Sequence, residues 1–142
     1  MRMKKYLPLT IAVALFAGTP AMADEVWSTE EYDVVYQEDR GQTAVWTYGA
    51  EETQGTIFID GLAGVYEDRG TYTGYWVQPT SSRRCDTFRE GADGKPTYHW
   101  GRFEIEFIDS DFPSRWQAKF GLCDGEPRIT LNGTPMTAVD AK

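Results

Sequence analysis

Apolar and polar residues alternate along most of the chain after residue 24, which is the pattern of β-strands with one buried and one exposed face. In Arg102–Phe107 (RFEIEF) two phenylalanines and an isoleucine alternate with charged residues, and Arg115–Phe120 (RWQAKF) follows the same rule. The sequence after the first 23 residues holds no helix-period segment of useful length. The pattern therefore predicts an all-β domain.

Turn-forming residues divide this pattern into eight predicted strands. The strands are Glu31–Gln37, Thr43–Tyr48, Thr56–Asp60, Leu62–Tyr66, Thr71–Gln78, Tyr98–Ile108, Arg115–Leu122 and Pro127–Leu131, with a turn pair at Asn132–Gly133. Most connections are short enough to be hairpins, so we predict a single-domain antiparallel meander. Eight such strands favour a small up-and-down barrel, with a sandwich as the alternative.

One phrase occurs twice, as VYQEDRGQTAVW (35–46) and as VYEDRGTYTGYW (65–76). Each copy reads as a strand end, an acidic-Arg-Gly turn, and a further strand that carries a tryptophan. Gly41 and Gly70 supply the positive φ that tight turns need. We therefore predict a duplicated hairpin. The alternative, a doubled cation-binding loop, is disfavoured because each copy carries its own arginine.

The second copy also pairs small and large residues on one strand face, since Gly74 lies two residues before Trp76. This arrangement suits a curved sheet or the interior of a small barrel. The Gly-x-x-x-Gly-x-Trp spacing over 70–76 resembles strands of lipocalin- and streptavidin-type barrels. The resemblance is one of pattern, and it implies an eight-stranded barrel without assigning any binding residue.

The first 23 residues predict a secretory signal peptide. A basic start, an apolar run over Leu7–Gly18 and the small-x-small triplet Ala21–Ala23 follow one another in the order that export signals require. The apolar run is shorter than the roughly 20 residues that cross a bilayer. We expect cleavage after Ala23, a mature domain over 24–142 with a flexible tail at 134–142, and a periplasmic or secreted location.

The chain is acidic, with a formal net charge of −8. Removal of the predicted signal peptide takes away basic residues only, so the mature protein is more acidic still. Such a surface repels phosphate backbones and anionic lipid headgroups. We therefore predict that the protein binds neither nucleic acid nor, after signal cleavage, a membrane.

Cys85 and Cys123 are the only cysteines. In an exported protein an even number of cysteines predicts a disulfide, and two cysteines within one chain leave a single pairing. The bond would tether the long connection Pro79–Pro96 to the end of the strand Arg115–Leu122. Connections of this length are often functional.

Aromatic residues on neighbouring predicted strands are the main functional signal. Tyrosine and tryptophan combine an apolar body with a polar tip, which suits stacking on a sugar or enclosing an apolar ligand. Our first hypothesis is a non-enzymatic module that binds a small molecule or glycan inside the barrel. The ligand-binding residues predicted on this basis are Tyr72, Trp76, Tyr98, Trp100 and Trp116. The alternative, that these side chains only fill the barrel, stays open.

A second hypothesis is a protein–protein module, such as an inhibitor of a secreted or envelope enzyme. In this hypothesis the 79–96 loop is the inserted element, and Arg83 and Arg84 beside the predicted disulfide contact the partner. The crosslink would preorganise the loop and so lower the entropy lost on binding.

A third hypothesis is a small glycoside hydrolase. Glu104 and Glu106 share a strand face, and their surroundings resemble the E-I-D-x-x-E strand of certain β-sandwich glycoside hydrolases. No third acid occurs at the expected place. The single histidine, His99, lies in no catalytic motif, and two aspartates in IDSDFPSR (108–115) are too few for a calcium site. We predict a protein that is not an enzyme and has no cofactor and no metal site.

Overall fold

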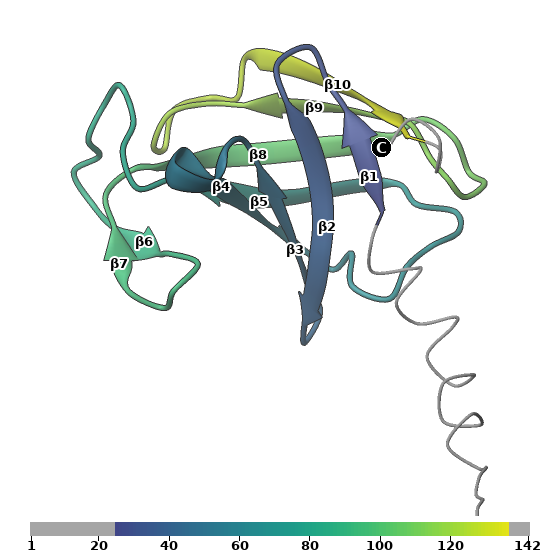
Figure 1. Ribbon diagram of the computed structural model, residues 1–142, viewed down its shortest axis with the longest axis horizontal. Coiled ribbons are helices and arrows are strands. Elements are labelled where there is room, and N and C mark those ends of the chain that lie inside the picture. The colour runs from purple at the N-terminus through teal and green to yellow at the C-terminus, as the bar shows by residue number, and fades with distance from the viewer. Residues whose placement is uncertain (1–24, 137–142) are drawn as a thin grey trace, which may run out of the picture.

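The computed structural model describes residues 25–136, so the predicted signal peptide and the last six residues lie outside the described range. Eight strands form a closed antiparallel barrel, which confirms the predicted all-β meander (Figure 1). They are β1 (Val26–Ser28), β2 (Asp33–Arg40), β3 (Thr43–Tyr48), β4 (Gly55–Asp60), β5 (Thr71–Val77), β8 (Trp100–Phe107), β9 (Trp116–Phe120) and β10 (Ile129–Pro135). A 3-10 helix, η2 (Glu51–Thr53), connects β3 to β4, and a two-stranded sheet, β6 (Arg89–Glu90) with β7 (Pro96–Thr97), lies outside the barrel.

The period-two alternation sets the inside and outside of the barrel as predicted. In the β8–β9 ladder, Ile105 lies opposite Ala118 and both side chains are buried in the barrel core. Glu104 lies opposite Lys119 on the outer surface. The two strands therefore pair through an apolar interior and an oppositely charged exterior.

The predicted strand Leu62–Tyr66 is wrong, because residues 61–70 form a loop across one end of the barrel. β4 pairs directly with β5, so the connection between them is free to fold over the barrel end. Within this loop Gly61, Gly64 and Asp68 have positive φ, whereas Gly70 does not. The two copies of the repeated phrase thus differ: the first forms the predicted β2–β3 hairpin, with Gly41 at φ 62°, and the second does not.

Arg69 explains why the second copy folds differently. Its guanidinium is buried and donates two hydrogen bonds of 3.0 Å to the carboxylate of Glu25. The same guanidinium lies over the rings of Tyr66, Phe107 and Phe112, with centroid distances of 5.0–5.7 Å. The loop is therefore anchored by a buried ion pair under an aromatic cover, and this closes one end of the barrel.

The remaining strand of the barrel, β1, was not predicted from the sequence, because it has only three residues. It closes the barrel by pairing with β2 on one side and β10 on the other. The predicted Asn132–Gly133 turn is also wrong, since β10 continues through both residues to Pro135 and so enters the predicted tail. Gly133 lies opposite Trp116, and a Cβ atom there would overlap the tryptophan ring. This glycine makes room for a side chain and does not make a turn.

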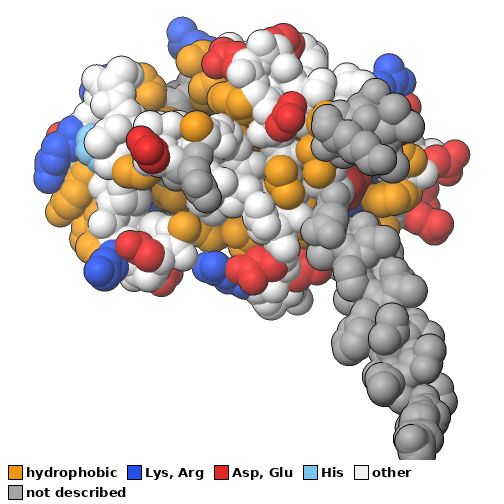
Figure 2. All heavy atoms as spheres, viewed as in Figure 1, with side chains coloured by type: hydrophobic (Ala, Val, Ile, Leu, Met, Phe, Trp, Pro, Cys, Tyr) orange, Lys and Arg blue, Asp and Glu red, His pale blue; other side chains and the backbone are white. Residues whose placement is uncertain are grey.

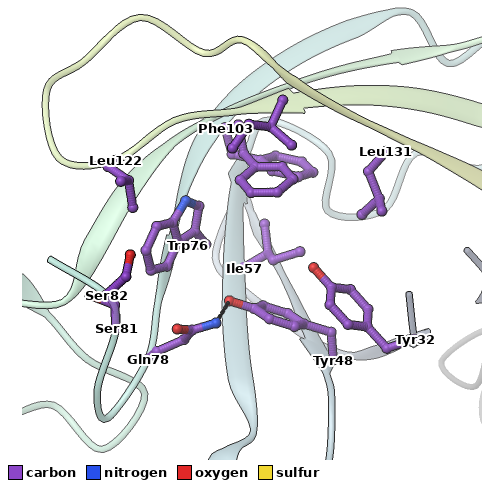
Figure 3. Close-up of a pocket in the computed structure, with 12 residues that line it drawn as sticks. Tyr32, Tyr48, Ile57, Trp76, Gln78, Ser81, Ser82, Phe103, Leu122 and Leu131 are labelled. Carbon is purple, nitrogen blue, oxygen red and sulfur yellow. Dashed lines mark hydrogen bonds between the residues drawn. The ribbon is translucent and has the colours of Figure 1, made fainter. Parts of the chain in front are cut away.

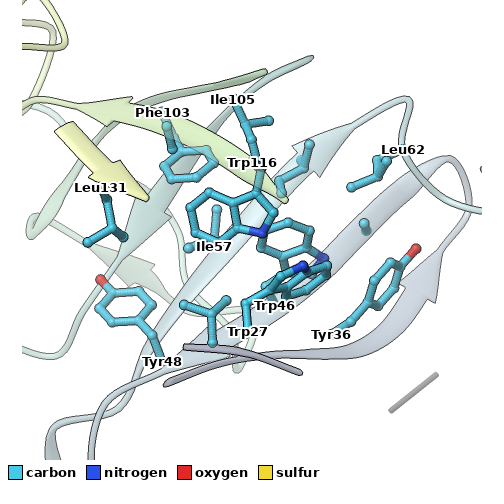
Figure 4. Close-up of a cluster of buried hydrophobic side chains, with 14 of the residues drawn as sticks. Trp27, Tyr36, Trp46, Tyr48, Ile57, Leu62, Phe103, Ile105, Trp116 and Leu131 are labelled. Carbon is cyan, nitrogen blue, oxygen red and sulfur yellow. The ribbon is translucent and has the colours of Figure 1, made fainter. Parts of the chain in front are cut away.

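Three tryptophans fill the barrel interior next to the closed end (Figure 4). Trp27, Trp46 and Trp116 are fully buried, and their ring centroids lie 4.5–5.9 Å apart. We call these three residues the tryptophan cluster. The indole N–H groups of Trp46 and Trp116 have no hydrogen-bond partner within residues 25–136. This part of the barrel is a packed core.

A second, smaller apolar cluster lies on the outside of the barrel. Segment 79–99 folds back over the outer face of β3, β4, β5 and β8 and carries Cys85 into this cluster. The cluster consists of Val45, Phe58, Val77, Cys85 and Trp100. The long connection is therefore attached to the barrel by apolar packing as well as by the disulfide.

A candidate binding cavity at the open end of the barrel

The end of the barrel opposite the 61–70 loop holds a cavity of about 250 Å³ (Figure 3). Interior positions at the strand ends supply most of its wall. The lining residues are Tyr32, Tyr48, Ile57, Trp76, Gln78, Ser81, Ser82, Phe103, Phe120, Leu122, Ile129 and Leu131. The wall is mostly apolar and includes no charged side chain. The barrel is thus packed at one end and hollow at the other.

Apolar side chains form the deep part of the cavity. Ile57, Phe103 and Leu131 come from three different strands and belong to the same core as the tryptophan cluster. Figure 4 draws Ile57 and Phe103 next to Trp116, with Leu131 at the edge of the same cluster. Since the cluster fills the barrel beyond them, the cavity does not continue to the closed end.

Trp76 forms one wall and is held in a fixed orientation. Its indole N–H donates to the backbone carbonyl of Gly121 at 2.9 Å, and only 6% of the residue is exposed. Gly101 makes this position possible, because a Cβ atom there would overlap the Trp76 indole. With its N–H already bonded, Trp76 offers the cavity an apolar ring.

Two tyrosines and a glutamine form the polar part of the wall together with the two serines (Figure 3). The hydroxyl of Tyr48 accepts a 2.9 Å hydrogen bond from Nε2 of Gln78, so its own proton remains available for a further acceptor. The rings of Tyr32 and Tyr48 lie 4.8 Å apart. Burial, with a smaller contribution from Glu31, raises the pKa of Tyr32 to about 12, and burial also raises the pKa of Tyr48. Both phenols are therefore protonated donors at neutral pH.

The disulfide joins two loops that border the cavity. Cys85 and Cys123 are bonded, as predicted, with their Cα atoms 5.5 Å apart. The first loop contributes Ser81 and Ser82 to the wall, and the second contributes Leu122. The crosslink therefore fixes the cavity mouth, and an oxidised pair is consistent with an extracytoplasmic compartment.

Replacing both cysteines with alanine is expected to lower the free energy of unfolding by about 3–4 kcal/mol, from the loop entropy of a crosslink that spans 38 residues. Chemical denaturation of the oxidised wild type and of the Cys85→Ala/Cys123→Ala variant measures the difference. Wild-type protein under reducing conditions is the control, and it should match the variant. Equal stability of all three samples would contradict a structural role for the bond.

The structure does not bring the five predicted ligand-binding residues together. Only Trp76 lines the cavity. Tyr72 packs edge-on against Phe107 near the closed end, and Trp116 belongs to the tryptophan cluster. Trp116 therefore fills the barrel, which was the alternative interpretation of these aromatic residues.

The other two predicted ligand-binding residues lie outside the barrel. Trp100 is buried in the outer apolar cluster, and its indole N–H donates to the carbonyl of Thr87 at 2.9 Å. Tyr98 lies before β8 and beneath the guanidinium of Arg84. Neither contributes to the cavity wall.

Sequence analysis missed most of the cavity residues. Tyr32, Tyr48 and Gln78 come from segments that are distant in sequence, and they share only an inward position at the same end of the barrel. The alternation of residues gives the inward face of each strand. Which strand ends share the open mouth depends on the pairing of all eight strands.

The remaining candidate residues lie away from the cavity. Glu104 and Glu106 are on the outer face of β8. The Nδ1 atom of His99 is 3.0 Å from the hydroxyl of Ser81, which also donates to the carbonyl of Arg83 at 2.7 Å. In the loop after β8, the carboxylate of Asp109 accepts three hydrogen bonds from Arg115.

Within residues 25–136, no group of three or more His, Cys, Asp or Glu side chains is arranged to hold a metal ion. The described part of the chain also includes no helix with the length and apolar character to cross a membrane.

Comparisons with known proteins returned no match, whether to family models, to curated proteins or to solved structures. The fold and site define an eight-stranded up-and-down barrel with a closed end, an open end and an apolar cavity. Function must therefore be inferred from the chemistry of the cavity.

Proposed function

We propose that the protein is a non-enzymatic binding module that holds one small, neutral, largely apolar molecule in the open end of its barrel. The observation that carries this proposal is the cavity itself: an uncharged hollow bordered by phenol hydroxyls and fixed at its mouth by a disulfide. Concave apolar sites with a few placed polar groups are the usual form of small-molecule sites.

The volume limits the size of the ligand. A cavity of about 150 Å³ accepts benzene, whereas drug-sized ligands occupy roughly 300–1,000 Å³. At about 250 Å³ the cavity lies between these values. It suits a single-ring compound or a short branched chain, and a longer molecule would extend out of the mouth past Leu122 and Ile129.

The polarity of the wall limits the chemistry of the ligand. An ion transferred into an uncharged apolar cavity loses hydration that nothing replaces. The Tyr48 hydroxyl is free to donate and so suits a carbonyl, ether or hydroxyl oxygen. Of the two ligand classes considered from sequence, the wall favours a small apolar molecule over a glycan, because a sugar ring carries more hydroxyls than the few polar groups here can satisfy.

Benzyl alcohol and benzoate form a matched pair of probes that tests this proposal. They have the same size, and at neutral pH only benzoate is charged. We expect benzyl alcohol to bind with a Kd of about 1 mM or tighter and benzoate to bind at least tenfold more weakly. Intrinsic tryptophan fluorescence follows the titration, since Trp76 lines the cavity. Equal binding of both probes, or binding of neither, would sink the proposal.

A blocked mouth should abolish this binding. Ile129→Trp places a large side chain at a rim position that is 50% exposed. Ile108→Trp is the matched control, because Ile108 is 54% exposed but does not line the cavity. Benzyl alcohol is expected to bind the Ile108→Trp variant with wild-type affinity and to lose most of its affinity for Ile129→Trp. The same affinity in both variants would place the ligand elsewhere.

Tyr48→Phe should separate the polar from the apolar part of the site. The variant loses the hydroxyl that we assign to the ligand oxygen, so affinity for benzyl alcohol is expected to fall about 3- to 10-fold. Toluene has no oxygen, and its affinity should change less than twofold. Each protein is titrated with benzyl alcohol and with toluene added from its saturated vapour, and the changes in the two affinities are compared. A parallel loss for both probes would show that the hydroxyl only shapes the wall.

A further inference from the structure

The arginines of the described chain fall into two groups. Residues 25–136 contain eight arginines, of which four form ion pairs: Arg40, Arg69, Arg115 and Arg128. Within the same range the other four have no carboxylate within ion-pair distance: Arg83, Arg84, Arg89 and Arg102. A chain with a net charge of −8 therefore keeps half of these arginines unpaired.

These unpaired arginines gather on one side of the molecule. Arg83, Arg84 and Arg89 belong to segment 79–99, and Arg102 lies on the outer face of β8 directly opposite Tyr75 of β5. Tyr75 is also one of the rings beneath Arg89. In the space-filling view, basic and apolar side chains lie next to one another on the side of β6 and β7 (Figure 2).

Aromatic rings support two of these guanidinium groups. The Cζ atom of Arg89 lies 4.6 Å from the ring centroid of Tyr75 and 4.7 Å from that of Trp100. The Cζ atom of Arg84 lies 4.0 Å from the ring centroid of Tyr98. A guanidinium stacked on a ring still presents its N–H groups at its edge, in the fork that matches a carboxylate.

An exposed apolar side chain lies beside the stacked arginines. Phe88 is 58% exposed, and its ring packs edge-on against Tyr98 at 5.9 Å. We call Arg84, Phe88, Arg89, Tyr98 and Arg102 the arginine–aromatic face. Arginine and aromatic residues are the types that dominate binding energy at protein interfaces.

The backbone under this face is well fixed. Cys85 is crosslinked to Cys123, and its backbone N–H donates to the carbonyl of Tyr98 at 2.7 Å. Trp100, beneath Arg89, is buried in the outer apolar cluster. A surface already ordered in the free protein loses little conformational entropy when a partner binds.

We propose that the arginine–aromatic face docks an acidic segment of a partner protein, in which carboxylates flank an apolar side chain. The carboxylates bind the forks of Arg84 and Arg89, and the apolar side chain packs on Phe88. Charge favours a short segment over a long polyanion, because a nucleic acid or sulfated polymer would extend over the acidic remainder of the surface. This proposal is independent of the ligand cavity.

A displayed library of random dodecamer peptides tests the proposal on the oxidised protein. We expect the selected peptides to be enriched in Asp and Glu next to an aromatic or aliphatic residue. Arg84→Gln/Arg89→Gln should weaken the best peptide at least tenfold. Arg115→Gln/Arg128→Gln is the matched control: it makes the same charge change at two exposed ion-paired arginines that are not part of the face and should have less than a twofold effect.

Two additional samples separate the alternatives. Phe88→Ser should weaken the same peptide at least threefold, and the cavity variant Ile129→Trp should leave its affinity unchanged. The proposal is overturned if the selected peptides lack acidic residues, if both double variants have the same effect, or if heparin binds this face while no peptide does.

Discussion

Replacing Arg69 with methionine is expected to lower the free energy of unfolding by about 3–5 kcal/mol, which makes it one of the two most damaging single changes that the structure predicts. The guanidinium is fully buried, and its partner carboxylate on Glu25 is almost so. Methionine fills much of the space but leaves that carboxylate without a countercharge. The loop 61–70 and β1 then lose the contact that closes the end of the barrel. Urea denaturation measures the loss.

The pH dependence of this variant provides a second readout. Burial raises the pKa of Glu25, and in the wild type the hydrogen bonds and charge of Arg69 oppose that rise. Without Arg69 the folded-state pKa rises further above the unfolded value of about 4.3–4.5. Below the unfolded pKa the carboxyl is protonated in both states and imposes no penalty. As pH rises above it, only the unfolded state ionises freely, so Arg69→Met should lose about 1.4 kcal/mol per pH unit until the folded-state pKa is reached.

Removing both charges is the control. Glu25→Leu/Arg69→Met replaces the ion pair with apolar side chains, and such replacements are often neutral or stabilising. We expect the double variant to recover most of the stability that Arg69→Met loses and to show no added pH dependence from this site. A double variant as unstable as Arg69→Met at every pH would mean that the loss came from packing and not from an unpaired carboxylate.

Trp116→Ala is expected to have an effect of similar size, about 3–5 kcal/mol, because it removes a fully buried indole from the centre of the tryptophan cluster. Gly133, the residue directly opposite on β10, has no side chain that could move into the space. Thermal and urea unfolding of the variant give the magnitude.

Trp116→Phe is the matched variant for this position. The indole N–H of Trp116 has no partner in the described chain, so phenylalanine gives up ring volume but also removes an unsatisfied donor. We expect a loss of less than half that of Trp116→Ala. Equal losses for phenylalanine and alanine would indicate that the N–H makes an interaction, for instance with an internal water.

The sequence allowed the architecture to be predicted because each strand carries its own alternation. The alternation in RFEIEF predicted which residues of β8 point inward, and the presence of only two cysteines allowed only one disulfide. The prediction failed at a glycine whose role is steric. Gly133 accommodates Trp116 within a strand, and no local sequence pattern distinguishes that role from a turn.

Arg69 and the cavity lay beyond local patterns for a similar reason. The two copies of the repeated phrase are nearly identical around their arginines, yet Arg69 is buried and Arg40 is exposed. The difference arises from Glu25, which lies 44 residues before Arg69. In the same way, Tyr32, Trp76 and Leu131 become neighbours only when the barrel closes. Contacts between distant segments decide both features, and alternation does not encode them.

Methyl-resolved NMR of the oxidised protein, titrated with benzyl alcohol, will show whether the open end of the barrel holds a small neutral ligand. We expect saturable shifts of the Ile57, Leu122 and Leu131 methyl resonances and no shift of the Leu62 resonances at the closed end. Saturable shifts confined to Leu62, or the absence of any saturable shift among the cavity methyl groups, would contradict this expectation.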